Sequence, residues 1–169
     1  MALPTSRVDA LVAAFVRISA TRMAGLGLSH PLLRVEAVGF RDWEQHQIGV
    51  LVTPWAMNLV VLAADGAGAA SLKLGPDRRQ AWRFPSGEYD LMGGEEPECG
   101  AFQCCSLFSP MHEFADQAAA VATAAEIMRA LFAPGDVDDR EKARATGDSV
   151  LQAPVSRRGF LRGILAQRG

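Results

Sequence analysis

The stretch QHQIGVLVTPWAMNLVVLAA, residues 45–64, decides the fold. Its two apolar runs, residues 45–53 and 58–64, have the valine, leucine and isoleucine content of strands. Pro54 ends strand pairing between them because proline lacks an N–H donor. The apolar density of the first run predicts a central strand that is covered on both faces, and the short connection predicts that the two strands are antiparallel neighbours.

Further strand patterns surround this pair. Asp65-Gly66-Ala67-Gly68 is a hairpin turn signal, and the acidic segment 93–97 is expected to be a loop. The additional strands are expected at residues 33–40, 69–74, 79–84, 88–92 and 98–108.

Amphipathic helices flank the strands. The first is expected to begin after Ser6, with Asp9 as its capping-box partner, and to end at Gly25 and Gly27.

The second helix is expected to begin with Ser109 as its cap and Pro110 as its first residue, and to stop at Pro134-Gly135. This order predicts the α+β class: an antiparallel sheet of five to seven strands with an N-terminal and a C-terminal helix, followed by a flexible tail. We expect both helices to cover one face of the sheet and the other face to stay partly exposed. The domain then spans residues 1–134, and residues 135–169 form a polar linker and a basic C-terminal tail.

Charge and composition restrict the function. The net charge is −2, and residues 156–169 hold four arginines and no acid, so residues 1–155 carry −6. An acidic body argues against nucleic-acid binding. No apolar run reaches the roughly 18 residues of a membrane span, so we expect no stable membrane insertion. Three unevenly spaced cysteines do not indicate a secreted disulfide framework and favour the cytoplasm.

The tail carries the motif Ser156-Arg157-Arg158-Gly159-Phe160-Leu161-Arg162, which reads like a twin-arginine export signal at the wrong end of a chain. Because few residues follow the motif, we expect that it does not export its own chain. A protein that carries such a look-alike without using it is a candidate for handling the signals of other proteins.

Three short blocks carry a resemblance to a known family. Residues 50–57 (VLVTPWAM), 84–87 (FPSG) and 105–110 (CSLFSP) resemble, in order and spacing, the HybE/HupJ/HoxT family of [NiFe]-hydrogenase assembly chaperones, over about residues 5–133. The resemblance implies a non-enzymatic cytoplasmic protein that binds the hydrogenase small-subunit precursor, withholds its twin-arginine signal from export until assembly is complete, and has other maturation proteins as further partners. It carries over no active site, and we expect no catalytic residue, metal or cofactor.

We expect partner contacts in these blocks and in the acidic segment. Pro54 stiffens a turn that offers Trp55 and Met57 as apolar contacts, with the alternative that Trp55 caps the core. The carboxylates of residues 95–98 are candidates for binding guanidinium groups, with the alternative of a solvated loop. The expected partner-binding residues are Thr53, Pro54, Trp55, Met57, Pro85, Gly87, Glu95, Glu96, Cys105, Leu107 and Phe108, with Arg157, Arg158, Phe160 and Leu161 in the tail.

The tail motif is expected to occupy, in the free chaperone, the site that takes the client's signal. Its arginines would pair with Glu95, Glu96 or Glu98, and Phe160 and Leu161 would fill an apolar groove.

Two other functions remain open. The first is an oxygen-protective or metal-handling maturation factor that uses Cys104 and Cys105. Adjacent side chains of a strand point to opposite faces, which argues against shared ligation of one ion. The second is a small hydrolase with Cys105 as nucleophile and His112 as base, although no evident group orients the histidine.

Overall fold

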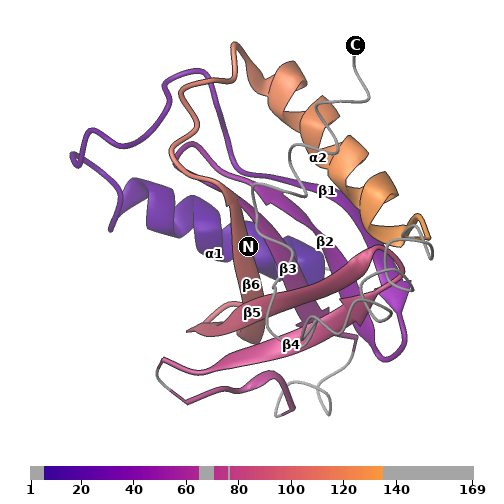
Figure 1. Cartoon of the computed structure of the whole chain (residues 1–169). Helices are drawn as coiled ribbons and strands as arrows, with labels where there is room; N and C mark the ends of the chain where they lie inside the picture. The colour runs from indigo at the N-terminus through magenta and orange to yellow at the C-terminus, as the bar shows by residue number, and fades with distance from the viewer. Residues whose placement is uncertain (1–5, 65–70, 76, 135–169) are drawn as a thin grey trace.

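The computed structural model describes residues 6–64, 71–75 and 77–134, in which two helices accompany one six-stranded antiparallel sheet (Figure 1). The strands lie in the order β1-β2-β3-β6-β5-β4. In chain order the elements are α1 (Arg7–Ala20), β1 (Glu36–Trp43), β2 (His46–Val52), β3 (Met57–Ala63), β4 (Arg79–Phe84), β5 (Gly87–Glu96), β6 (Gly100–Phe108) and α2 (Gln117–Phe132). The α+β class and the strand number are as expected. Among the described residues, no helix is long and apolar enough to cross a membrane.

The helices lie on opposite faces of the sheet, not on one face as expected (Figure 1). In β2, Ile48 and Val50 belong to the core beneath α2, whereas Leu51 belongs to the core beneath α1. The alternation of side chains explains this division, because residues 48–52 are all buried and both faces of the strand therefore need a cover.

The sheet coils so that its two edge strands approach each other on the α2 side. The rings of Trp43 in β1 and Phe84 in β4 lie 6.2 Å apart, centroid to centroid. Phe132 in the last turn of α2 lies 5.0 Å from Trp43 and 6.1 Å from Phe84. This aromatic cluster closes one end of the α2-side core.

Helix α1 begins as expected but ends earlier. The Ser6 hydroxyl accepts a hydrogen bond from the Asp9 N–H at 3.1 Å, as a cap does. The helix ends at Ala20, and Gly25 and Gly27 lie in the loop that follows, with φ angles of 75° and 70°.

Helix α2 begins seven residues later than the expected Pro110, at Gln117, and its cap is Asp116, whose carboxylate accepts the Ala119 N–H at 2.8 Å. The intervening residues form a turn that buries Met111 and Phe114. Burial of these two side chains outweighs the local capping pattern at Ser109.

Three of the expected strand ranges differ from the structure by three residues or more. β1 starts at Glu36 and not at residue 33, because Leu33 fills the core from the preceding loop. β5 continues to Glu96, so the expected loop 93–97 is mostly strand, paired with β6. Residues 71–74 form no strand; Leu72 is buried in a short helical turn. The hairpin turn at residues 65–68 and the tail from residue 135 onward lie outside the described residues.

Candidate functional site

Three connections meet at one end of the sheet: the loop 21–35 before β1, the turn 53–56 between β2 and β3, and the segment 109–116 before α2. His30 joins them. Its backbone N–H donates to the Pro54 carbonyl at 2.8 Å, its ring Nε2 lies 2.8 Å from the Phe114 carbonyl, and its ring Nδ1 accepts the Leu32 backbone N–H at 3.1 Å. Because Nδ1 accepts, the ring proton is assigned to Nε2, which donates to Phe114.

The turn at residues 53–56 is built on a buried hydroxyl. The Thr53 hydroxyl donates to the Ala56 carbonyl at 2.7 Å and accepts the Ala56 N–H at 3.0 Å. Thr53, Pro54 and Met57 are buried. These three predicted contact residues therefore shape the turn and do not present a surface to a partner.

Trp55 occupies an intermediate position. Its ring stacks on Phe15 of α1, with centroids 6.3 Å apart and planes 10° from parallel, and the rest of the side chain is partly exposed. The stacking on Phe15 agrees with the alternative that Trp55 caps the core, and a contact between Trp55 and a partner stays a prediction.

The loop 21–35 presents an apolar surface that the sequence reasoning missed. Leu26, Leu28 and Leu32 are 56%, 51% and 64% exposed, and we call these three residues the leucine surface. The loop is held in place although the leucines are exposed: Leu33 is buried, and the Gln117 side chain bonds to the backbone N–H of Arg34 at 3.0 Å. Exposed large apolar groups that cluster on a fixed backbone are typical of interaction sites.

Exposed carboxylates lie in the segment that contacts the leucine loop. Glu113 and Asp116 are exposed in the segment that His30 joins to the leucine loop. Arg34, which follows Leu32 and Leu33 in the chain, forms an ion pair with Glu36 at 3.1 Å. The segment that contacts the leucine loop through His30 therefore offers exposed carboxylates.

The second block lies at the opposite end of α2. The Ser86 N–H donates to the Leu131 carbonyl at 3.1 Å and so satisfies a carbonyl in the last turn of the helix. Pro85 is half-buried and Gly87 is buried. The 16 residues of α2 separate this turn from the helix start by about 24 Å. The structure therefore does not bring Pro85 and Gly87 together with Trp55.

The third block continues the core. Cys105 is buried on the α2 side, whereas Cys104 packs on the α1 side, as strand alternation predicts. Leu107 and Phe108 are half-buried, and Phe108 meets Phe114 edge to face at 5.0 Å. Phe108 thus packs against the segment 109–116 through Phe114.

The cysteines show little sign of ligand or nucleophile chemistry. Burial raises the pKa of both the Cys99 and the Cys104 thiol to about 11, which keeps them protonated at neutral pH. Within the described ranges, no group of three or more His, Cys, Asp or Glu side chains could hold a metal ion. Cys105 lies in the core and His112 is exposed, so the two do not present a nucleophile and its base on a common surface.

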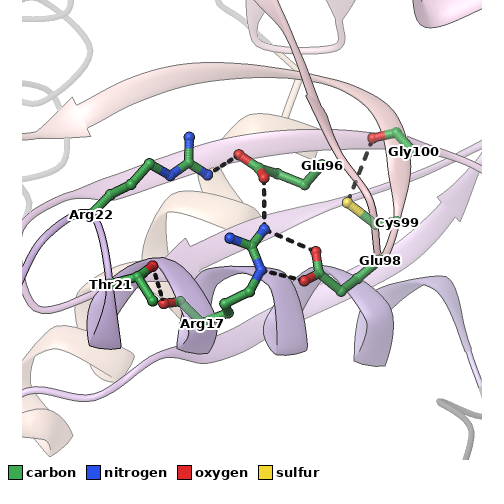
Figure 2. Close-up of polar contacts among 7 residues, drawn as sticks. All are labelled: Arg17, Thr21, Arg22, Glu96, Glu98, Cys99 and Gly100. Atoms are coloured by element: carbon green, nitrogen blue, oxygen red, sulfur yellow. Dashed lines mark hydrogen bonds and ion pairs between the residues drawn. The ribbon is translucent and has the colours of Figure 1, made fainter.

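The acidic segment already binds guanidinium groups, and they come from α1 and the residues just after it. Figure 2 shows Arg17 between two carboxylates, 2.8 Å from Glu96 and 2.5 Å from Glu98, with Arg22 also paired to Glu96. The Arg17 hydrogen bond is the main reason that the pKa of Glu98 is lowered. Glu95 is more exposed and lies 3.5 Å from Lys73. The chemistry expected of this cluster is present, but Glu96 and Glu98 use it to hold α1 on the β5–β6 hairpin.

Comparisons with known proteins agree on one family. The family model described as "[NiFe]-hydrogenase assembly, chaperone, HybE" matches residues 6–163, and so extends past residue 133 into the tail sequence. Protein HoxT of Cupriavidus necator is 42% identical over 146 residues, which cover 80% of this chain and 80% of that protein. The hydrogenase expression/formation protein HupJ of Bradyrhizobium diazoefficiens is 38% identical over 160 residues, which cover 95% of this chain and 89% of that protein.

A solved structure shares the fold. The solution structure of HybE from Escherichia coli matches 76% of this chain and 78% of its own with a TM-score of 0.58, at 23% sequence identity. Together with the family match along nearly the whole sequence, this places the chain in the HybE family of [NiFe]-hydrogenase assembly chaperones.

Proposed function

We propose that this chaperone binds the precursor of a [NiFe]-hydrogenase small subunit in the cytoplasm, through its twin-arginine signal, and withholds the precursor from export until assembly is complete. The observation that carries the proposal is the motif Ser156–Arg162, which lies inside the region matched by the family model. A chain that carries a copy of an export signal has a ready means to compete with a real one.

We also propose that residues 156–162 compete with the client for the same site. The prediction that Arg157 and Arg158 pair with Glu96 or Glu98 needs revision, because these two carboxylates already form ion pairs with Arg17. Carboxylates that are free of arginine partners, such as Glu113, fit the role better.

Co-purification tests the function directly. The chaperone is captured from cells that express a tagged small subunit, either complete or lacking its signal, with the large subunit as a parallel bait. Capture by the complete small subunit alone supports the proposal. Equal capture after deletion of the signal, or capture by the large subunit only, contradicts it.

The alternative of a metal-handling factor is disfavoured by one observation. Cys104 and Cys105 pack on opposite sides of the sheet, so the adjacent pair cannot ligate one ion together.

A further inference from the structure

We propose that the leucine surface, together with the Glu113 carboxylate, is the docking site for the client's twin-arginine signal; this rests on the function proposed above. The leucines take the apolar segment of the signal, and the carboxylate takes its arginines.

The first support is clustering. Five large hydrophobic side chains are prominently exposed in the described part of the chain: Val16, Leu26, Leu28, Leu32 and Met92. Three of them lie between positions 26 and 32, in one loop, whereas Val16 lies on α1 and Met92 on β5. The two isolated side chains are ordinary, and the cluster is the exception.

The second support is preorganisation. His30 lies between Leu28 and Leu32 in the sequence and fixes the loop through its hydrogen bonds to Leu32 and Phe114. Leu33 anchors the same segment in the core. Because the backbone is already ordered, a peptide that binds the exposed leucines loses its own freedom without having to order the loop as well.

The third support is charge. A twin-arginine signal places guanidinium groups directly before an apolar segment. The Phe114 carbonyl accepts a hydrogen bond from the His30 ring in the leucine loop. Glu113 is the residue before Phe114, so it lies next to this contact in the chain. Among the described residues Glu113 forms no ion pair, in contrast to Glu96 and Glu98. Glu113 can therefore accept an arginine without breaking an internal pair.

The test titrates a fluorescein-labelled synthetic peptide, with a twin-arginine motif followed by an apolar segment, onto the full-length protein and its variants. Leu28→Ser with Leu32→Ser should weaken binding about tenfold or more, because each leucine buries apolar surface against the peptide. The matched controls are Val16→Ser and Met92→Ser, which remove exposed apolar groups elsewhere and should bind as the wild type does.

Charge is tested separately. Glu113→Gln should weaken binding about threefold at low salt, and the difference should vanish for a peptide whose two arginines are replaced by glutamine. Melting curves of all variants show whether each remains folded; because the substituted side chains are exposed, their melting temperatures should match the wild type.

The outcomes separate the site from the function. If the wild type binds the peptide and the leucine variant binds it equally well, the site lies elsewhere while the proposed function stands. If the wild type binds the small subunit only through its mature part and ignores the peptide, both proposals are wrong.

Discussion

At the scale of single residues, Trp55 links the turn at residues 53–56 to α1. We expect Trp55→Ala to lower the free energy of unfolding by about 1–3 kcal/mol, less than for a fully buried aromatic, because the ring loses its stacking on Phe15. Trp55→Phe keeps an aromatic ring there and should lose less than half as much. Urea unfolding measures both variants. Equal stability of the alanine variant and the wild type would show that the stacking contributes nothing.

The cysteines give a second prediction at this scale. Cys104→Ala and Cys105→Ala should each leave a metal-free protein that still supports hydrogenase maturation, because the two side chains pack on opposite sides of the sheet and cannot share one ion. Elemental analysis of purified protein and hydrogenase activity of complemented cells are the measurements. Stoichiometric zinc or iron in the wild type, lost in either variant, would contradict the prediction and favour the metal-handling alternative.

Single residues differ in how far their positions could be predicted from the sequence. The opposite orientation of Cys104 and Cys105 follows from the two-residue period of a strand, and the structure confirms it. The exposure of Leu28 and Leu32 could not be predicted, because a leucine is assigned to the core unless a tertiary contact, here the bonds of His30, holds its backbone at the surface.

At the scale of elements, the attachment of α1 to the β5–β6 hairpin should depend on pH. The Arg17 hydrogen bond lowers the pKa of Glu98 from its ordinary value of 4.5, so the charged form is favoured in the folded state. Stability from this group is present above pH 4.5 and is lost as the pH falls through the lowered folded pKa. Glu98→Gln should therefore flatten the decline in melting temperature between about pH 5 and pH 3.

The matched control for this prediction is Glu88→Gln. Glu88 pairs with Arg83 at 3.6 Å, and both side chains are more than half exposed. This substitution should therefore leave the decline in melting temperature at acid pH as it is in the wild type. If the melting temperatures of the wild type and Glu98→Gln decline equally at acid pH, the contact between Arg17 and Glu98 does not hold α1 in solution.

Local patterns predicted elements well where neighbours in sequence decide the outcome. The range 79–84 expected for a strand is that of β4, because flanking turns define both ends. The predicted start of α2 was wrong, because the burial of Met111 and Phe114 is a tertiary effect that no capping pattern reveals. The contact between Arg17 and Glu98 spans 81 positions, and the sequence carries no signal for it.

At the scale of the whole molecule, the C-terminal motif should act as a competitor. Tethering sets an effective concentration on the order of millimolar, so a self-contact with a millimolar Kd would weaken external binding about twofold and a stronger one proportionally more. Truncation after Pro154 should therefore tighten binding of a labelled signal peptide, and so should Arg157→Ala with Arg158→Ala. Unchanged affinity makes the motif a bystander, and weaker affinity means that it recruits the client.

The position of β6 in the sheet has a consequence for synthesis on the ribosome. β6 lies between β3 and β5, yet it is the last strand to be made. At about 5–20 residues per second, β3 waits for this partner for a few seconds after its own completion, and its apolar residues 59–62 then present an open edge. A nascent chain that stalls before residue 108 thus has the features of an aggregating edge strand. The interval before β6 is complete is therefore when this chain is most open to edge-to-edge pairing with another chain.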